Sequence, residues 1–385
     1  MSNKQQTHRH GVGGRVMRSA LMVLAIGLAA CSSGPKKPQP APLEPVVPLV
    51  AAQQVWSQQV GAIDPLLVPV VRDGLLALAN AAGEVSVLQA ETGQLRWRAA
   101  AGAPMGAGVG FDGQRVALVT RDSDLVVLTP TGVAWRQRIA ARVYTPPLVA
   151  GERVFVLAGD RSVSAFDART GAPLWRWTSR GTEPLVLQQA GVLTAVRNTL
   201  VVGIGGRLVG LDPDAGRVQW DTVVARTRGA TEIERLVDPV GRVGRDGDVL
   251  CVRAFQAAVG CVDTVSGRTL WSQPADGAVG VQADAERVYG TEANGRVRAW
   301  RRSDGGQAWS NERLLHRGLS APLAIGRSLA IGDAQGYVHL LARADGALLN
   351  RLATDGSPIV EGPLAAGNTL IAVTRAGGVY AWRPQ

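Results

Sequence analysis

The chain has 385 residues, of which 46% are hydrophobic and 47 are glycine, and its formal net charge is +10. A chain of this length and apolar content can build a core larger than that of one ordinary domain. The arginines are scattered, without a basic stripe interleaved with aromatic residues, which argues against nucleic-acid binding. The four histidines, two of which lie in the first ten residues, leave little for acid–base or metal chemistry.

The N-terminus has the pattern of a bacterial lipoprotein signal. Basic residues precede an apolar stretch over residues 20–29, which is too short to span a bilayer and fits a signal-peptide core. The stretch ends in Leu28-Ala29-Ala30-Cys31, which resembles the lipobox, in which the chain is cut before a cysteine that is then lipidated. We therefore expect a signal peptide over 1–30 and a lipid on Cys31. The alternatives are an unmodified cysteine after an ordinary signal peptide, and a start at Met17.

A proline-rich segment over residues 31–50 follows the signal. Its prolines are Pro35, Pro38, Pro40, Pro42, Pro45 and Pro48. This composition is typical of an extended linker, so we expect a tether between the lipid and the folded body. An aspartate directly after the lipidated cysteine would resemble the signal that retains a lipoprotein at the inner membrane. This chain has Ser32 at that position, so the signal is absent. The sequence therefore predicts a lipid-anchored protein on the periplasmic face of the outer membrane.

From residue 51 onward one phrase recurs at a spacing of about 40 residues, which is typical of a β-propeller. The phrase is a turn that ends in glycine, most often Thr-Gly or Asp-Gly, followed after three or four residues by tryptophan. Six copies end in Trp97, Trp135, Trp175, Trp220, Trp271 and Trp309, and the seventh has Asn350 in place of the tryptophan. An aromatic residue at one repeat position is a building block, so we expect these tryptophans to pack between blades.

Each repeat contains four short apolar strands. In one copy they fall at residues 148–149, 154–157 and 163–166 and around Trp175. Asp and Gly separate them, because Asp bonds backbone amides and Gly accepts positive φ. This pattern predicts four-stranded antiparallel blades.

The two ends of the chain complete the count of blades. After Asn350 only three strands remain, near residues 358–360, 370–373 and 378–382, whereas residues 55–60 form an outer strand with no blade before it. An N-terminal strand that completes the last blade would close the ring and remove its edges. We therefore predict an all-β, eight-bladed β-propeller over residues 51–385.

Two cysteines remain after Cys31. Cys251 and Cys261 are placed symmetrically about Gln256, so a hairpin centred there sets them opposite each other. Opposed residues in an antiparallel pair come within disulfide range, and exported proteins retain disulfides. We expect a disulfide, and two buried free thiols are the alternative.

Two consecutive connectors depart from the repeat. The interval from Trp220 to Trp271 is longer than its neighbours and contains residues 227–238, where Thr231 and Glu234 fit a capping box that starts a short helix or turn. The connector after Trp175 contains Pro184-Leu185-Val186-Leu187. Both connectors emerge on one face of a propeller, and leucine beside charged residues suggests a protein-binding patch. The alternative is a decorated loop that packs on itself.

The repeat also resembles the blades of pyrroloquinoline-quinone dehydrogenases, which carry a catalytic Asp, a calcium site and often adjacent cysteines. This chain has no Cys-Cys pair, and Asp167, Asp212 and Asp263 occupy the same turn in several blades. A residue repeated in every blade is structural, so we predict neither catalytic residues nor a cofactor or metal.

Taken together, the lipobox, the proline-rich tether, the eight blades and the insert Arg228-Gly229-Ala230-Thr231-Glu232-Ile233-Glu234-Arg235-Leu236-Val237-Asp238 resemble the BamB family of outer-membrane lipoproteins. In that family a Leu-x-Leu-Arg connector and an acidic pair bind BamA, the assembly barrel. Leu185 and Leu187 match the leucines, Gln188 stands at the arginine, and Asp238 matches the first acid. Val240 stands where the second acid would be, so the family's salt bridge between the loops is in doubt. The partner-binding candidates also include Arg228, Glu232 and Arg235.

The resemblance implies a lipid-anchored, non-enzymatic scaffold of the β-barrel assembly machinery (the BAM complex). Such a scaffold would dock on the periplasmic domains of BamA beside the other subunits, aid insertion of barrel proteins and present unfolded clients. Three alternatives stay open: a quinone-dependent dehydrogenase, a propeller that binds carbohydrate or lipopolysaccharide, and a propeller that binds another envelope protein.

Overall fold

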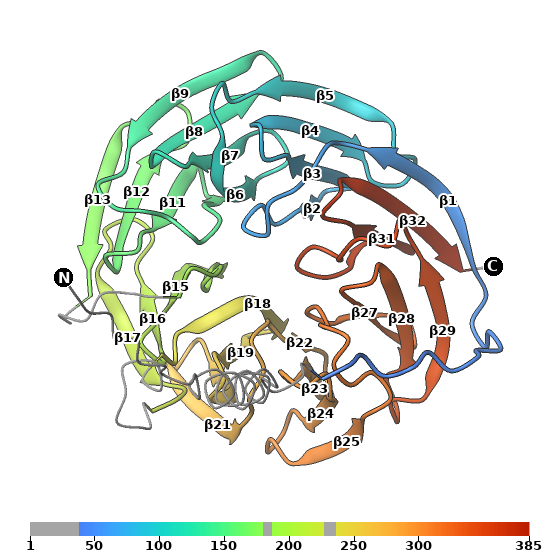
Figure 1. The fold of residues 1–385 in the computed structure, drawn as a ribbon. Helices are drawn as coiled ribbons and strands as arrows, with labels where there is room; N and C mark the ends of the chain where they lie inside the picture. The colour runs from blue at the N-terminus through green and yellow to red at the C-terminus, as the bar shows by residue number, and fades with distance from the viewer. Residues whose placement is uncertain (1–37, 180–186, 227–235, 385) are drawn as a thin grey trace, which may run out of the picture. The chain divides into compact units, whose positions relative to one another are not determined.

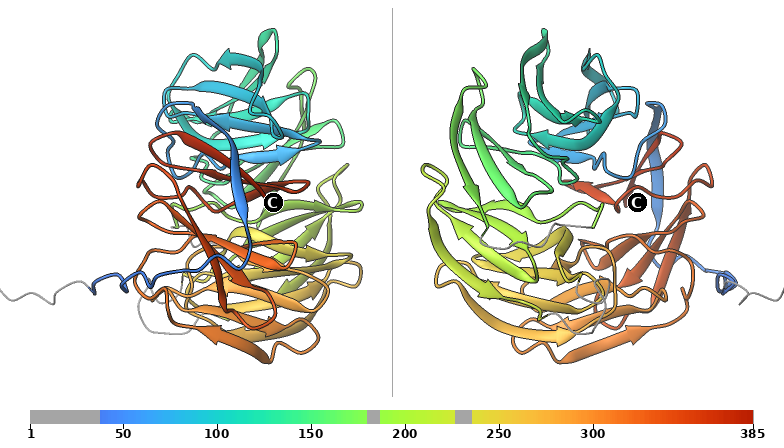
Figure 2. Two further views of the ribbon diagram at one scale, coloured as in Figure 1. Left: turned by 90° about the vertical axis from the view of Figure 1, so that its right-hand side faces the viewer. Right: turned by 60° about the vertical axis from the view of Figure 1, so that its left-hand side comes forward.

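The computed structural model describes residues 38–179, 187–226 and 236–384. The chain divides into two units, residues 1–39 and 40–385. In the second unit, the described residues form eight four-stranded sheets arranged as the blades of a ring (Figure 1). Figure 2 shows the same blades from two further directions. The predicted all-β, eight-bladed propeller is confirmed.

The blades are numbered in chain order, and each runs from an inner to an outer strand. Blade 1 contains β2 (Val70–Arg72), β3 (Leu75–Ala79), β4 (Glu84–Gln89) and β5 (Leu95–Ala100). Blade 2 contains β6 (Met105–Phe111), β7 (Val116–Thr120), β8 (Asp124–Thr129) and β9 (Gly132–Arg138). Blade 3 contains β10 (Leu148–Ala150), β11 (Arg153–Leu157), β12 (Ser162–Asp167) and β13 (Pro173–Thr178). Blade 4 contains β14 (Leu193–Val196), β15 (Thr199–Ile204), β16 (Arg207–Leu211) and β17 (Val218–Val223).

The second half of the ring repeats this order. Blade 5 contains β18 (Pro239–Asp246), β19 (Val249–Ala254), β20 (Ala258–Asp263) and β21 (Arg268–Pro274). Blade 6 contains β22 (Gln282–Ala283), β23 (Arg287–Thr291), β24 (Val297–Arg301) and β25 (Gln307–Asn311). Blade 7 contains β26 (Leu323–Ile325), β27 (Ser328–Gly332), β28 (Tyr337–Ala342) and β29 (Leu348–Ala353). Blade 8 contains β30 (Leu364–Ala366), β31 (Thr369–Val373), β32 (Gly378–Pro384) and, outermost, β1 (Ala52–Gln59).

Burial follows the position of a strand in its blade. The second strand of blade 2, β7, is buried at every residue, because sheets of adjacent blades cover both of its faces. The outer strand β9 alternates between half-buried and exposed residues, because only one of its faces meets the next blade. The apolar runs seen in the sequence are therefore the middle strands, and the alternating segments are the outer ones.

The N-terminal strand closes the ring as predicted. β1 pairs antiparallel with β32, with Trp56 opposite Ala381 and Gln54 opposite Trp382. Figure 1 shows β1, in blue, beside the red β32. Blade 8 is thus built from both ends of the described chain, and no edge is left between blades 8 and 1.

Six of the outer-strand tryptophans join their blade to the next. Trp175 of blade 3 covers Gly216 in the turn before the outer strand of blade 4, where a Cβ would lie 2.5 Å from the Trp175 ring. The Trp175 indole N–H also donates to the carbonyl of Pro213 at 3.0 Å. Only a glycine fits under the ring, which explains why Gly and Trp recur together. The same contact joins Trp56 to Gly93, Trp135 to Gly171, Trp220 to Gly267, Trp271 to Gly305 and Trp309 to Gly346.

The recurrent aspartates hold these turns. Asp212 accepts hydrogen bonds from the backbone N–H groups of Asp214 and Ala215 at 2.8 and 3.0 Å. Asp263 likewise accepts the backbone N–H groups of Val265 and Ser266, at 2.9 and 3.0 Å. These bonds lower the pKa of both carboxyl groups. The structural role predicted for this repeated residue matches its contacts.

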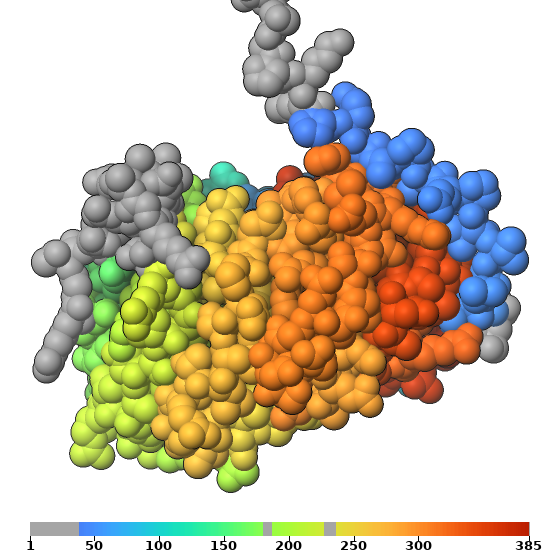
Figure 3. Space-filling view, turned by 90° about the horizontal axis from the view of Figure 1, so that it is seen from below, coloured from blue at the N-terminus to red at the C-terminus, as the bar shows by residue number. Residues whose placement is uncertain are grey.

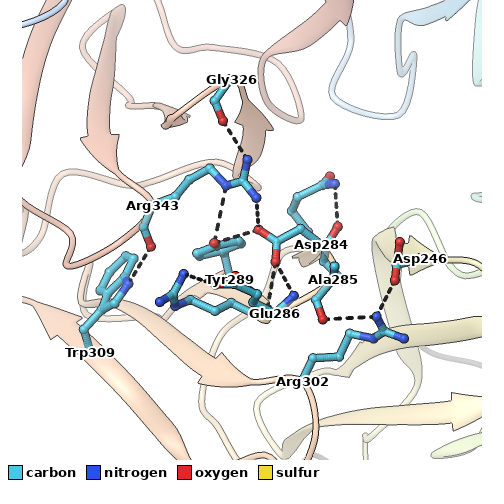
Figure 4. Close-up of polar contacts among 12 residues, drawn as sticks. Asp246, Asp284, Ala285, Glu286, Tyr289, Arg302, Trp309, Gly326 and Arg343 are labelled. Atoms are coloured by element: carbon cyan, nitrogen blue, oxygen red, sulfur yellow. Dashed lines mark hydrogen bonds and ion pairs between the residues drawn. The ribbon is translucent and has the colours of Figure 1, made fainter.

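The ring has two faces. The turn face carries the turns between first and second strands and between third and fourth strands. The connector face carries the links from each outer strand to the next blade. On the turn face, Arg343 of blade 7 bonds Asp284 of blade 6, which also accepts the Tyr289 hydroxyl at 2.8 Å (Figure 4). Arg302 of blade 6 likewise reaches Asp246 of blade 5. Arginines thus link neighbouring blades across this face.

Cys251 on β19 and Cys261 on β20 lie directly opposite each other. Their Cα atoms are 4.0 Å apart, the two are joined by a disulfide, and both are fully buried. The turn residue between them, Gln256, has a φ of 46°. The hairpin expected about this residue therefore has the register that sets the cysteines face to face.

We predict that protein made in the periplasm carries this disulfide. Its loop is short, so the Cys251→Ala/Cys261→Ala variant should lose about 2–3 kcal/mol of unfolding free energy. Thiol counting by mass spectrometry under non-reducing conditions, with reduced protein as control, tests the bond. Two free thiols at these positions would contradict it.

Candidate functional site

The two long connectors of the connector face are consecutive in the ring. One links β13 to β14 and the other links β17 to β18. Of the residues that the sequence implicates in partner binding, Leu187, Gln188 and Asp238 lie in the described parts of these connectors. The others lie outside the described residues, as does the expected lipidation site: Cys31, Leu185, Arg228, Glu232 and Arg235. The expected capping box at Thr231 and Glu234 also lies outside them.

Backbone contacts hold the two connectors together. Gly191 forms an isolated antiparallel bridge with Val240, and the N–H of Gly241 donates to the carbonyl of Ala190 at 2.8 Å. The N–H of Gly191 also donates to the Thr145 hydroxyl at 3.0 Å, which ties the pair to the preceding connector. The end of the first connector is therefore fixed against the start of β18.

Leu187 and Asp238 line one small cleft between the connectors. The cleft has a volume of about 30 Å³, which is room for roughly one water molecule. Its wall also includes Tyr144, Thr145 and Leu157 of the blade 3 side. The structure therefore brings together two of the residues that the sequence implicates, one from each connector.

Asp238 faces the protein interior rather than solvent. It is 6% exposed, and its carboxylate accepts the N–H of Gly205 at 2.6 Å, while its backbone carbonyl accepts the N–H of Phe255 at 3.0 Å. Burial raises the pKa of this carboxyl, and the Gly205 bond and the charge of Arg161 oppose that change. Asp238 thus holds the β15–β16 turn and the base of the second connector, a role that the sequence did not suggest.

The described part of the first connector has uncharged side chains at its surface. Gln188 is exposed, and Leu187 is half-buried, as are Gln189 and Ala190. Val240, at the position of the second family acid, is 2% exposed within β18. A salt bridge between Gln188 and Val240 is chemically excluded, so backbone contacts order this pair of connectors instead.

The central channel contains one polar contact that sequence reasoning missed. Arg242 on β18 donates from its guanidinium to the carbonyl of Pro363 at 2.8 Å, and its backbone N–H donates to the Glu361 carboxylate at 3.3 Å. These contacts join blade 5 to the entry of blade 8. They lie beside a cavity of about 360 Å³ lined by inner strands of several blades. Neither residue recurs in other blades, so the repeat carries no signal for them.

Neither metal ligation nor a membrane-spanning helix is indicated for the part of the chain that the structure describes. Within residues 38–179, 187–226 and 236–384, no group of three or more His, Cys, Asp or Glu residues is arranged to hold a metal ion. In the same ranges no helix has the length and apolarity needed to cross a bilayer.

Comparison with known proteins places the chain in a family. Residues 81–311 match the family model described as outer membrane protein assembly factor BamB. The outer membrane protein assembly factor BamB of Burkholderia pseudomallei is 36% identical over 93% of this chain and 95% of its own length. The crystal structure of BamB from Moraxella catarrhalis has a TM-score of 0.78 and 26% identity, covering 86% of this chain and all of that one.

An enzyme shares the fold more distantly. Quinohemoprotein alcohol dehydrogenase from Comamonas testosteroni has a TM-score of 0.65 at 15% identity, covering 86% of this chain and 76% of its own. That likeness is one of fold alone. The family model and the similarity to the Burkholderia protein cover most of the chain, and this protein therefore belongs to the BamB family of outer membrane protein assembly factors.

Proposed function

We propose that this protein is a non-enzymatic scaffold subunit of the outer-membrane β-barrel assembly complex, and that it docks on the periplasmic domains of BamA through the connector face. The observation that carries the proposal is the pairing of the two long connectors through Gly191 and Val240, which leaves Gln188 exposed and Leu187 half-buried. Family membership supports the partner.

The protein would be held at the periplasmic face of the outer membrane by a lipid. Residues 1–30 are proposed to be its signal peptide and Cys31 the lipidated residue. Several acyl chains on one residue make anchoring effectively stable, because each buried CH₂ contributes about 0.8 kcal/mol.

The absence of catalysis is proposed on two grounds. The aspartates that recur in the blades are engaged by backbone N–H groups of their own turns, so they have a structural use. Beside the channel, the Arg242 guanidinium donates to the carbonyl of Pro363 and the Glu361 carboxylate accepts the backbone N–H of Arg242, so both groups have structural partners.

The docking surface is tested by charge substitution. Burying a leucine at an interface contributes about 1.5–3 kcal/mol, so Leu187→Glu, alone or with Leu185→Glu, should weaken binding to BamA by roughly tenfold or more. Gln188→Glu tests the exposed neighbour without altering the cleft. Binding would be measured by recovery of BamA in a pull-down and by titration with its purified periplasmic domains.

Leu174→Glu is the matched control. Leu174 is 48% exposed on β13, the strand that precedes the first connector, but it is not part of a connector. The control should bind normally, and the thermal unfolding of every variant should resemble that of the wild type. Undiminished recovery of BamA by folded Leu187→Glu and Gln188→Glu proteins would place the docking surface elsewhere.

A further inference from the structure

The chain between residues 41 and 51, called here the N-terminal segment, lies against the outside of blade 7. It was expected to be part of a free tether, but its backbone is bonded to the ring. The N–H of Leu49 donates to the carbonyl of Leu349 at 2.9 Å, and the N–H of Ala41 donates to the carbonyl of Leu315 at 2.9 Å. Figure 3 shows this segment in blue, passing over the surface next to the strands of blade 7.

Arginines of the ring bind the carbonyl groups of the same segment. Arg327 donates to the carbonyl of Leu49 at 2.8 Å, Arg351 to that of Glu44 at 3.1 Å, and Arg317 to that of Ala41 at 3.0 Å. Arg313 adds an exposed ion pair with the Glu44 carboxylate at 3.2 Å.

The order of these contacts gives the segment a direction. Arg327 is in the β26–β27 turn, on the turn face, whereas Leu315 and Arg317 are in the link between β25 and β26, on the connector face. Going from Ala52 toward the N-terminus, the chain therefore crosses the whole depth of blade 7 and arrives at the connector face.

Asn350 explains why blade 7 receives this segment. In six other places an outer-strand tryptophan covers a glycine in the turn before the outer strand of the next blade. Blade 8 takes its outer strand from the N-terminus, so it has no such turn for a tryptophan at position 350 to cover. Asn350, 7% exposed, instead donates its side-chain amide to the carbonyl of Val50 at 2.8 Å. The one departure from the tryptophan pattern is therefore a binding residue for the N-terminal segment.

The far end of the segment rests on a buried charge. Arg317 is 3% exposed, and its Nε donates to the Asp333 carboxylate at 2.8 Å while one Nη donates to the Gln335 side chain, which leaves the other Nη directed at the carbonyl of Ala41. Exposed ion pairs such as Arg313 with Glu44 stabilise little, whereas a buried guanidinium has one fixed geometry. The exit point of the chain is thus set by a rigid group.

We propose that the N-terminal segment delivers the membrane-attached end of the chain to the connector face, so that this face is the side of the ring turned toward the lipid surface. The inference rests on the proposed lipidation of Cys31. Ten residues separate Cys31 from Ala41, a reach of at most about 35 Å, whereas release as far as Ala52 would extend the reach to about 70 Å from the turn face. The docked segment therefore places the connector face, and not the turn face, nearest the membrane.

The docking is tested with proline, which removes a backbone donor without altering the ring. Ala41→Pro/Leu49→Pro deletes both backbone N–H bonds of the segment and keeps its extended, proline-rich character. Gln39→Pro/Val47→Pro is the matched control, because Gln39 is exposed and Val47 is 81% exposed. A spin label at Leu43→Cys should be immobilised in the wild type and the control, and mobile in the release variant. A mobile label in the wild type would overturn the proposal.

The orientation is tested on the lipidated protein bound to phospholipid vesicles that contain an acceptor dye. A donor dye is placed at Gln188→Cys on the connector face or at Gln114→Cys in the β6–β7 turn on the turn face, both exposed positions. We expect greater energy transfer from residue 188 than from residue 114, and loss of that difference in the Ala41→Pro/Leu49→Pro background. Equal transfer in the wild type, or a difference that survives release, would overturn the orientation alone. Failure of the wild type to float with vesicles would overturn the anchor, and the orientation with it.

Discussion

A chain that lacks residues 51–60 is expected not to form a stable monomeric ring. The deletion removes β1, which pairs with β32 from Ala52 to Gln59, and leaves β32 as an open edge that can pair with other chains. It also removes Trp56, whose ring covers Gly93 and whose indole N–H donates to the carbonyl of Ala90 at 3.2 Å. Strand β32 of blade 8 and the Gly93 turn of blade 1 therefore both lose their contacts with β1.

Size-exclusion chromatography and thermal unfolding measure this effect, with aggregation or a large fall in Tm as the expected result. Trp56→Ala should show a smaller loss, of about 3 kcal/mol or more if the site cannot collapse. Val55→Ser serves as the control, because Val55 is 41% exposed on the same strand. A monomeric deletion protein that unfolds at the wild-type temperature would contradict the role assigned to β1.

The fold could be predicted because one physical contact generates the repeat. Six outer-strand tryptophans each lie over a glycine of the next blade, so the two residue types recur together and mark the blades that have such a turn. Trp97 shows the limit of this signal. The turn of blade 2 is only two residues long, and nothing lies within 4 Å of a Cβ on Gly132, so this tryptophan matches the pattern without making the contact.

The N-terminal segment shows what could not be predicted. Its proline content indicated an extended chain, which is how the structure describes it, but composition does not say whether an extended chain lies free or on a surface. The residues that bind it, among them Arg327 and Arg351, lie in blade 7 and in the link before it and do not recur in other blades, so they stand outside the repeat. Asn350 was visible as a departure from the pattern, yet its meaning depends on a strand that is about 300 residues away.

The candidate site was predicted only in part for a similar reason. A long connector is visible as a break in the repeat spacing, so the location of the site could be predicted from the intervals between tryptophans. The burial of Asp238 could not, because an acid in a loop is usually solvated, and only the approach of Gly205 from another turn gives its carboxylate an internal partner.

Asp333→Asn is expected to destabilise blade 7 strongly. The Asp333 carboxylate, 1% exposed, accepts hydrogen bonds from Arg317 at 2.8 Å and from His339 at 2.9 Å. It also accepts the backbone N–H groups of Gln335 and Tyr337, each at 2.9 Å. Loss of its charge leaves the Arg317 guanidinium buried without a counter-ion, which costs about 3–5 kcal/mol. The same loss should loosen the N-terminal segment at Ala41, because Arg317 positions that contact.

Acid should destabilise the wild type through the same cluster. Burial lowers the pKa of His339 below its ordinary value of 6.5, so below that pH the unfolded chain binds a proton that the folded one resists. Burial raises the pKa of the Asp333 carboxyl, but the hydrogen bonds from His339 and the backbone outweigh it and hold the pKa below its ordinary 3.8. Its stabilisation is therefore present above that pH and is lost as the pH falls further. Stability should decline from about pH 6.5 downward, first through His339 and then through Asp333.

Denaturant unfolding at pH 7.5 measures the effect of Asp333→Asn, and a second measurement at pH 5.0 gives the part of the acid effect that comes from His339. Asp345→Asn is the matched control, because Asp345 is an exposed turn residue of the same blade whose carboxylate accepts the backbone N–H of Ala347 at 2.9 Å. The unfolding free energy of that variant should lie within about 0.5 kcal/mol of the wild-type value, as is usual for exposed substitutions. His339→Gln should flatten the decline between the two pH values, because glutamine does not titrate there. An Asp333→Asn protein as stable as Asp345→Asn would show that Arg317 does not depend on this carboxylate, and the buried support of the N-terminal segment would have to come from elsewhere.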